Sequence, residues 1–596
     1  MPENNTAIRG GEFLIRPTAA ADIFIPEEWT EEQIMMKEMT LDFVNQRIIP
    51  NLDRIEAQEE GLTPKLMEET GELGLLGSSV PEEYGGMGLD FKTTMLITEA
   101  IGGAHSFSVS FSAHTGIGML PILYYGNEEQ KQRWIPGLAS GELKGCYCLT
   151  EPSAGSDANS GKTKAKLSDD GKHYIVNGQK MWITNGGFAD VMIVFAKIDD
   201  DEKLTAFIVD GHSEGITKNP EEKKLGIKGS STRQIFFNDV HVPVENLLYE
   251  RQQGFKIAVN ILNIGRIKLG GAVLGAAKDA CSYATQYANE REQFGRPISK
   301  YGAIRYKIAE SAIRLYTCES AVYRATQNID DAIAALKAGG MDHGDATLKG
   351  IADFAPECAM MKVLGSEVLD YCVDEAVQIH GGMGYSAETR AELAYRDARI
   401  NRIFEGTNEI NRMLTVDMIL KKAMKGEMDL MTPAMAVANE LTGVPDFASP
   451  SSDPFERQLG YVANLKKAIL LVAGAAVQKL MMSLAKEQEI LMNIADMAIW
   501  TYTIESTVLR VQKLAQQKGG TNDLEVQMAI MNVYTYEASE WIHSAGKEAL
   551  LGFAEGDELK MMLMGMKRFC KTEDLNTKAA RQLIAMHVIE KNAYTL

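Results

Sequence analysis

Apolar positions recur at helical spacing in the first part of the chain, from about Thr30 to Lys144. The segment Trp29-Thr30-Glu31-Glu32 has the form of a helix start in which Thr30 caps the first turn. Apolar residues such as Leu41 and Phe43 then follow at the spacing of one helix face. This pattern predicts an N-terminal helical domain over residues 1–145.

The pattern changes at about Gly145, where short runs of alternating apolar residues replace the helical spacing. Dipeptides that favour turns separate these runs, among them Asp170-Gly171 and Asn177-Gly178. The predicted strands are Tyr174–Gly178, Val191–Phe195, Ala206–Val209 and Gln234–Phe237. We therefore expect residues 146–252 to form a central antiparallel β domain, either a small barrel or a sandwich.

Helical spacing returns after the β domain. Long amphipathic runs joined by short loops predict an antiparallel helical bundle over residues 253–430: Phe255–Arg291, Ile304–Gln327 and Pro356–His380. A linker rich in proline and serine, Gly443–Pro454, precedes an additional helical domain over residues 455–596. The predicted fold class is α+β and mostly α.

Composition narrows the class of protein. A chain of 596 residues, 45% hydrophobic and 24% charged, has the length of roughly three to four globular domains. The net charge of -20 argues against nucleic acid as the main partner. The seven cysteines are scattered, with Cys146 and Cys148 on one face of a predicted strand. Because no second Cys or His pair stands at metal-ligand spacing, we expect reduced thiols and no metal site.

The chain shows no clear targeting or membrane signal. Met1 to Thr18 has neither a secretory nor a transit pattern. The longest apolar run near the C-terminus, Ala468–Val477, is about half the length that a membrane span needs. We therefore expect a cytoplasmic protein with at most peripheral membrane contact.

The segment Arg402–Ile410 holds the most informative side chain. Here Glu405 stands between Phe404 and Gly406, at the end of a charge-rich helical run. An acid beside an aromatic ring is poorly solvated, which raises its pKa and its basicity. The glycine allows a sharp turn and a close approach of the backbone to a ligand. The alternative is an ordinary helix stop with a solvated glutamate.

Two segments of the β domain have side chains suited to a planar cofactor. The strand-to-loop segment Tyr147–Asp157 is rich in small hydroxyl residues, so Thr150, Ser156 and exposed N–H groups could hold a polar ring edge or a phosphate. Trp182 and Thr184 lie two residues apart on a predicted strand and face the same side. One can stack on a ring while the other donates a hydrogen bond. A plain loop and a core tryptophan are the alternatives.

Two segments of the bundle add to this group. Arg291 ends a long helix in a basic, aromatic turn, where it could hold a pyrophosphate while Phe294 packs against an adenine or a flavin. The alternative is a charged helix end that Pro297 stops. The glycine cluster Gln378–Tyr385 follows a helix, so it is not the dinucleotide fingerprint, although its backbone can approach a cofactor. His380 is expected to be a structural hydrogen-bonding residue.

In this order and spacing, the five segments resemble the acyl-CoA dehydrogenase family of flavoproteins. The resemblance covers about Thr30 to Lys425, and the helical domain after Pro454 is similar to the extension of the very-long-chain branch. It implies an enzyme that uses FAD to convert a saturated acyl-CoA into trans-2-enoyl-CoA in fatty acid β-oxidation. A proton leaves Cα and a hydride leaves Cβ.

The resemblance also implies roles for individual residues, with Glu405 as the catalytic base. The implied cofactor-binding residues are Tyr147, Leu149, Thr150, Gly155, Ser156, Trp182, Ile183, Thr184, Arg291, Phe294, Gln378, Gly382, Thr407 and Glu409. Those in the two bundle segments are expected to reach the FAD of a neighbouring subunit. The implied substrate-binding residues are Ser156, Asn263, Arg266, Phe404 and Gly406.

Substrate length, partners and alternative functions follow from the same resemblance. Small residues Ser112 and Ala113 in the predicted helix Ser106–His114 would leave a deep acyl pocket, which favours long chains. The alternative is that the serines of this helix face solvent or pack tightly. Reduced FAD needs an electron acceptor, expected to be an electron-transfer flavoprotein, and the C-terminal helices favour a homodimer. Two other functions stay open: a non-catalytic FAD-binding assembly protein of the same fold, and an acyl-CoA oxidase that uses O2.

Overall fold

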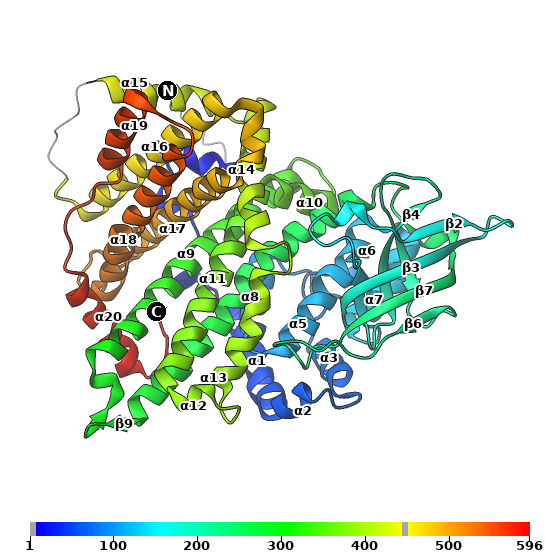
Figure 1. The fold of residues 1–596 in the computed structure, drawn as a ribbon. Helices are drawn as coiled ribbons and strands as arrows, with labels where there is room; N and C mark the ends of the chain where they lie inside the picture. The colour runs from blue at the N-terminus through cyan, green and yellow to red at the C-terminus, as the bar shows by residue number, and fades with distance from the viewer. Residues whose placement is uncertain (1–7, 444–450) are drawn as a thin grey trace.

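The structure, a computed structural model, describes residues 8–443 and 451–596. A β-sheet lies at one end of the molecule, long helices fill the centre, and the C-terminal helices form the other end (Figure 1). The predicted class, a mostly helical α+β fold with a central β domain, is confirmed. Part of the predicted linker, residues 444–450, lies outside the described residues.

The N-terminal helices begin where the sequence predicts. Thr30 caps α1: its hydroxyl accepts from the N–H of Gln33 at 3.3 Å, and the Gln33 side chain accepts from the N–H of Thr30 at 3.1 Å. This reciprocal pair satisfies donors that a helix start leaves free. The helices are α1 Glu31–Phe43, α2 Leu52–Glu56, α3 Leu62–Glu72, α4 Phe91–Gly102, α5 Ser106–Ser112, α6 Leu120–Tyr125 and α7 Glu128–Ser140.

The predicted helix Ser106–His114 is α-helical only to Ser112, where a wider π-helical turn, Ala113–Gly118, takes over. This turn packs directly on the first strand. A Cβ placed on Gly118 would lie 2.9 Å from the carbonyl carbon of Gly145. His114 links the two elements, because Nδ1 accepts from the N–H of Gly145 at 3.0 Å while Nε2 donates to the carbonyl of Leu138 at 2.8 Å. Burial lowers the pKa of His114 to about 4, so the ring is neutral.

The β domain contains a sheet ordered β6-β7-β3-β2-β4-β5-β8, with β1 also paired to β4. Its strands are β1 Gly145–Cys148, β2 Lys164–Leu167, β3 His173–Thr184, β4 Val191–Ile198, β5 Thr205–Asp210, β6 Ile216–Lys218, β7 Thr232–Pro243 and β8 Leu247–Leu248. Most pairs are antiparallel, as predicted, but β1 and β2 both run parallel to β4. The chain passes through β2 and β3 between β1 and β4, and through β3 between β2 and β4, so neither parallel pair has to be joined by a tight hairpin.

The helical bundle carries the long core of the molecule. Its helices are α8 Gly254–Glu290, α9 Gly302–Ala338, α10 His343–Asp353, α11 Ala355–His380, α12 Gly382–Tyr385, α13 Arg390–Ala398 and α14 Asn408–Met424. A small hairpin, β9 Glu292–Gln293 and β10 Arg296–Pro297, follows α8. Glycines let α8 and α11 approach closely, since a Cβ on Gly365 would lie 3.3 Å from the Cα of Gly270. These two helices form the rigid support for the loops described below.

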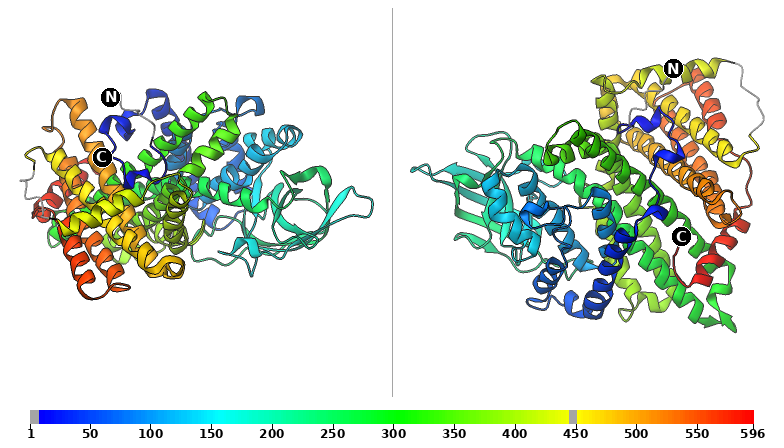
Figure 2. Two further views of the ribbon diagram at one scale, coloured as in Figure 1. Left: turned by 90° about the horizontal axis from the view of Figure 1, so that it is seen from above. Right: turned by 180° about the vertical axis from the view of Figure 1, so that it is seen from behind.

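The C-terminal helices pack beside α9 and α14. They are α15 Met431–Thr442, which the sequence did not predict, and α16 Pro454–Leu480, α17 Gln488–Lys518, α18 Glu525–Leu551, α19 Gly556–Phe569 and α20 Thr577–Lys591. The chain before α1 runs along the central and C-terminal helices (Figure 2). The ring of Phe13 lies 4.9 Å from that of Tyr502 on α17. Buried Arg510 on α17 pairs with Glu27 at 2.9 Å and with Glu319 of α9 at 2.8 Å.

The described residues contain two helices that are long and apolar enough to cross a membrane by length and composition: α8 and the run Pro454–Lys486. The most apolar stretch of α8 is 67% buried and that of the second run is 39% buried. The run Ala468–Val477, which alone is too short to span a bilayer, is therefore part of a longer apolar helix. For α8, burial inside the bundle accounts for the apolar surface.

The buried ion pair between Arg324 and Glu505 should contribute strongly to the stability of the C-terminal helices. Arg324 on α9 donates to Glu505 of α17 at 3.0 Å and is fully buried. We expect Arg324→Met to lower the free energy of unfolding by about 1.5–3 kcal/mol, because it removes a charged hydrogen bond to Glu505 while Lys466 stays paired with the same carboxylate at 2.5 Å. Thermal or urea unfolding followed by circular dichroism measures this. Lys560→Met, which breaks the exposed pair with Asp557, should cost less than about 1 kcal/mol. Equal effects of the two variants would contradict the account.

Candidate active site

Glu405 lies in a short loop whose backbone is under strain. The loop connects a 3₁₀ turn, Arg399–Arg402, to the start of α14. Glu405 has φ +57° and Gly406 has φ +82°, so two successive residues occupy the left-handed region. A non-glycine residue in this region costs on the order of 1 kcal/mol or more, and such strain persists only where the surroundings fix it.

One oxygen of the Glu405 carboxyl group is removed from water and unpaired. The residue keeps a little exposed surface, but its Oε2 atom is buried and has no hydrogen-bond partner among the described residues. Gly265 of α8 makes the room for it, since a Cβ there would lie 2.6 Å from Oε2. Burial raises the pKa of Glu405 to about 7, against the opposing effect of Arg266 and Lys362. The sequence-based expectation of a raised pKa is confirmed.

Three residues predicted from the sequence surround this carboxyl group. Arg266 donates through Nε to the carbonyl of Glu405 at 3.3 Å and through Nη1 to the Oδ1 of Asn263 at 2.9 Å. Both Arg266 and Asn263 are buried. Tyr147 on β1 is close enough for the charge of Glu405 to contribute, after burial, to the raised pKa of Tyr147. The structure thus brings α8, β1 and the 403–407 loop together around Glu405.

The segments of the β domain form a second group, at the edge of the sheet. The N–H of Met181 donates to the carbonyl of Thr150 at 2.9 Å, which ties the 149–163 loop to β3. Next to it, Trp182 is 60% exposed with φ +56°, at a break in the β3–β7 register. Such a break re-aims a side chain. Ile183 is buried and Thr184 is half-buried, while Leu149 is buried and Gly155 and Ser156 are exposed.

A buried ion pair anchors the 149–163 loop. Lys180 is fully buried, and its Nζ donates to Glu151 Oε1 and to the carbonyl of Phe195, both at 2.7 Å. Glu151 also accepts from the N–H of Thr163 at 3.1 Å. An exposed tryptophan beside a firmly anchored loop with free hydroxyls fits a planar, polar-edged ring system such as a flavin.

The predicted cofactor residues of the bundle lie far from this group. Arg291 ends α8, and Phe294 is 94% exposed on the β9–β10 hairpin. Gln378 is exposed near the end of α11, and Gly382 is exposed at the start of α12. Along α8, Gly265 and residue 290 are separated by roughly 37 Å at 1.5 Å per residue. Within a single chain, these residues are therefore too far from Glu405 to share one site with it.

The remaining predicted residues lie at the start of α14. Thr407 caps this helix, with its hydroxyl accepting from the N–H of Ile410 at 3.3 Å, and the same side chain hydrogen-bonds the carboxyl group of Glu409. Glu409 is exposed in the first helical turn, and hydrogen bonds from the backbone lower its pKa. Phe404 and Gly406 are half-buried on either side of Glu405. Among the described residues, the His380 ring makes one hydrogen bond, in which Nδ1 donates to the carbonyl of Ala376 in the same helix at 2.7 Å, and this agrees with a structural role.

The sequence-based reasoning missed three residues of the site: Gly265, Lys362 and Asn411. The two polar ones hold the backbone of the 403–407 loop. Lys362 of α11 donates to the carbonyl of Gly406 at 2.7 Å, although 44 residues separate them. The side-chain amide of Asn411 lies 2.8 Å from the same carbonyl. Only Asn411 could have been suspected, because it falls on the first turns of the helix that follows Glu405.

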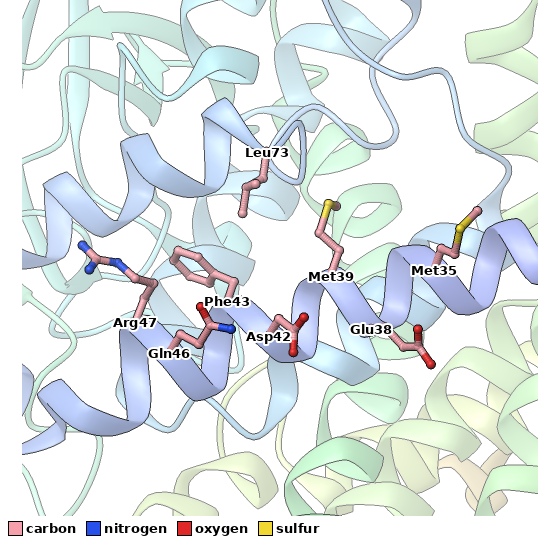
Figure 3. A pocket seen from close by; sticks show the side chains of 8 residues that line it. All are labelled: Met35, Glu38, Met39, Asp42, Phe43, Gln46, Arg47 and Leu73. Atoms are coloured by element: carbon pink, nitrogen blue, oxygen red, sulfur yellow. The ribbon is translucent and has the colours of Figure 1, made fainter.

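Two open grooves of the surface lie elsewhere. One, of about 470 Å³, follows α1, where Leu73 from the end of α3 faces Phe43 and Met39 while Glu38 and Asp42 line the groove (Figure 3). The other, of about 380 Å³, lies among the N-terminal segment, α15 and α16. Neither is lined by Glu405 or its contacts, so the site is defined by the surroundings of Glu405.

Comparison with known proteins agrees with this geometry. Models of the acyl-CoA dehydrogenase N-terminal, middle and C-terminal domains match residues 30–142, 146–240 and 252–420, and a further acyl-CoA dehydrogenase C-terminal domain matches residues 464–568. A probable acyl-CoA dehydrogenase of Bacillus subtilis (strain 168) is 44% identical over 589 residues, which cover 99% of this chain and 98% of that protein. The chain belongs to the acyl-CoA dehydrogenase family.

Two further members of the acyl-CoA dehydrogenase family bear on the site. The mitochondrial very long-chain specific acyl-CoA dehydrogenase of Rattus norvegicus is 36% identical over 491 residues, 77% of this chain and 71% of that protein. The crystal structure of the acyl-CoA dehydrogenase complexed with FAD from Bacillus anthracis matches with a TM-score of 0.96 and 45% identity. It covers 99% of this chain and 100% of that one.

An amide at position 405 should stabilise this acyl-CoA dehydrogenase at alkaline pH. The pKa of Glu405 is raised from 4.5 to about 7 on folding, so the folded protein holds a proton more tightly and loses stability as the pH rises through that range. Glu405→Gln should therefore match the wild type near pH 5 and exceed it at pH 8, by an amount on the order of 2–3 kcal/mol. Thermal unfolding at both pH values measures the difference.

The matched control is Glu409→Gln. Its carboxyl pKa is lowered in the folded chain, so the ionised group stabilises the protein above its unfolded pKa and the amide should bring no gain at pH 8. A gain from Glu405→Gln that is equal at pH 5 and pH 8 would show that the carboxyl group is not desolvated.

Proposed function

We propose that this protein is an FAD-dependent acyl-CoA dehydrogenase that oxidises long-chain acyl-CoA thioesters to trans-2-enoyl-CoA in fatty acid β-oxidation, with Glu405 as the base. The observation that carries the proposal is the buried, unpaired Oε2 of Glu405, whose pKa lies near 7. A carboxylate solvated by water is too weak a base for a thioester α-proton. A general base is most effective when its pKa lies near the working pH.

The 403–407 loop supplies the other requirement, stabilisation of the enolate that forms when the α-proton leaves. Among the described residues, the backbone N–H of Glu405 donates to no protein acceptor. A backbone donor aimed at a developing oxyanion is typically worth about 3 kcal/mol. The proton moves to the Glu405 carboxyl group, and Arg266 on its backbone carbonyl keeps the loop in place. The surroundings exclude water from Oε2 of that group.

FAD, when bound, supplies the hydride acceptor, which no protein side chain can do. Thr150, Ser156, Trp182 and Thr184 would hold its ring system at the sheet edge, with Tyr147, Leu149, Gly155 and Ile183 shaping the same edge. Thr407 and Glu409 would face its adenosine side. The Bacillus anthracis relative is complexed with FAD, which supports FAD as the cofactor.

The separation of the cofactor residues supports a homodimer. Because Arg291, Phe294, Gln378 and Gly382 stand at the far end of α8 from Gly265, they fit the FAD of a second copy better than that of their own chain. After turnover, the reduced cofactor must pass electrons to an acceptor, for which we propose an electron-transfer flavoprotein.

The small residues Ser112 and Ala113 support long acyl chains. Ser112 is half-buried and Ala113 is buried at the junction of α5 and the π-helical turn, and such small side chains suit the deep acyl pocket that we propose there. The likeness to the very long-chain specific enzyme of Rattus norvegicus points the same way.

Anaerobic mixing of the FAD-loaded protein with palmitoyl-CoA tests the proposal. We expect the flavin absorbance of the wild type to bleach, faster than with butyryl-CoA. Glu405→Gln should bind FAD but reduce it at least about 10³-fold more slowly, because the general base is lost. Glu427→Gln, which replaces an exposed carboxylate just beyond the end of α14, should stay within a few-fold of the wild type.

Three results would contradict the proposal. Wild-type protein that binds FAD without bleaching on any acyl-CoA would favour a non-catalytic FAD-binding protein. Stoichiometric peroxide formation in air at the rate of turnover would favour an oxidase. A Glu405→Gln variant that bleaches at the wild-type rate would remove Glu405 from the reaction.

A further inference from the structure

The backbone of the 403–407 loop is held by donors from three helices. Arg266 of α8 donates to the carbonyl of Glu405, and Lys362 of α11 donates to that of Gly406. The side-chain amide of Asn411 on α14 lies within hydrogen-bonding distance of the carbonyls of Glu405, Gly406 and Thr407, at 3.3, 2.8 and 3.0 Å. The left-handed backbone at Glu405 therefore has several anchors.

The hydrogen bonds of Lys362 alone do not explain why a charged side chain is buried at this position. Its side chain is fully buried, and its Nζ donates to Gly406 at 2.7 Å and to Asn408 Oδ1 at 2.8 Å. Within the described residues it forms no ion pair with a carboxylate. A buried ammonium without such a partner is costly, whereas Asn411 already bonds the same Gly406 carbonyl as a neutral amide. What Lys362 adds is its positive charge.

The charge of Lys362 acts on Glu405. The carboxyl group of Glu405 is the largest attractive influence on the ammonium, and Lys362 in turn opposes the rise of the Glu405 pKa. Burial lowers the pKa of Lys362 to about 8, so the side chain stays mostly charged at pH 7. The other charged or titratable groups around the pair are Arg266 on α8, Tyr147 on β1, Glu367 on α11 and Glu409 on α14.

We propose that Lys362 is a positioning residue for the base: its ammonium, fixed on the Gly406 carbonyl, orients the Glu405 loop and supplies the positive charge that lets the buried carboxyl group ionise. The proposal rests on the role of Glu405 proposed above. Lys362 acts through the loop and does not touch the substrate.

The test is the pH dependence of kcat/KM for palmitoyl-CoA in the FAD-loaded protein. The wild-type rate should rise through about pH 7 as Glu405 loses its proton. Lys362→Met keeps most of the side-chain length but removes the charge. The midpoint of the pH profile of this variant should therefore lie about one pH unit higher than that of the wild type. Raising the pH should restore much of the lost activity, with KM little changed. Lys466→Met, which removes another buried lysine that pairs with Glu505, should lower stability without moving the midpoint.

Unfolding provides a second readout without turnover. Because loss of the Lys362 charge leaves Glu405 harder to ionise, the stabilisation by Glu405→Gln at pH 8 should be larger in the Lys362→Met background than in the wild type. Lys362→Gln, which retains a donor but no charge, should behave like Lys362→Met in both experiments.

The outcomes separate the two proposals. A wild type that fails to bleach contradicts the proposed function. A wild type that bleaches while Lys362→Met has an unmoved midpoint, or an equal loss at every pH, overturns the inference on Lys362 alone. If neither Lys362→Met nor Lys362→Gln folds and takes up FAD, Lys362 is a structural residue and the inference is also overturned.

Discussion

A carboxyl oxygen kept out of water without a hydrogen-bond partner is the constraint on which this structure depends. Oε2 of Glu405 has its place only because Gly265 leaves the space that a Cβ would fill. Both the desolvated carboxyl group and the left-handed backbone at Glu405 cost free energy, so the surrounding helices must offset them. The close packing of α8 on α11 and the donors on the loop carbonyls do so.

The rest of the fold positions elements around that point. The sheet presents Tyr147 beside Glu405, and the anchored 149–163 loop lies next to the exposed Trp182. Buried ion pairs join α17 to α9, and Arg510 of α17 also pairs with Glu27 of the N-terminal segment, so the C-terminal helices are integral to the bundle rather than appended to it. Residues at the far end of α8 remain exposed, as expected if a second copy completes the cofactor site.

Local patterns predicted most of the elements, because helix caps and alternating apolar runs are encoded within a few residues. The Thr30 cap and the long helices α8 and α11 are examples. The parallel pairing of β1 and β2 with β4, the π-helical turn at Ala113 and helix α15 were not predicted. These features depend on contacts between distant segments, such as the packing of Gly118 on Gly145, which local spacing does not report.

The same limit applies to the site. The residues on either side of Glu405 are unusual enough to single it out in the sequence. The structure agrees with the predicted rise in its pKa. Gly265 and Lys362 are far from it in sequence, and neither carries a local signal, so only the folded chain identifies them.

The most direct test of this account is the titration of the Glu405 carboxyl group itself, by infrared difference spectra between the wild type and Glu405→Gln. We expect the protonated carboxyl band to disappear with a midpoint at about pH 7. A midpoint below about pH 5, the ordinary range of a solvated glutamate, would contradict the claim that this carboxyl group is held out of water.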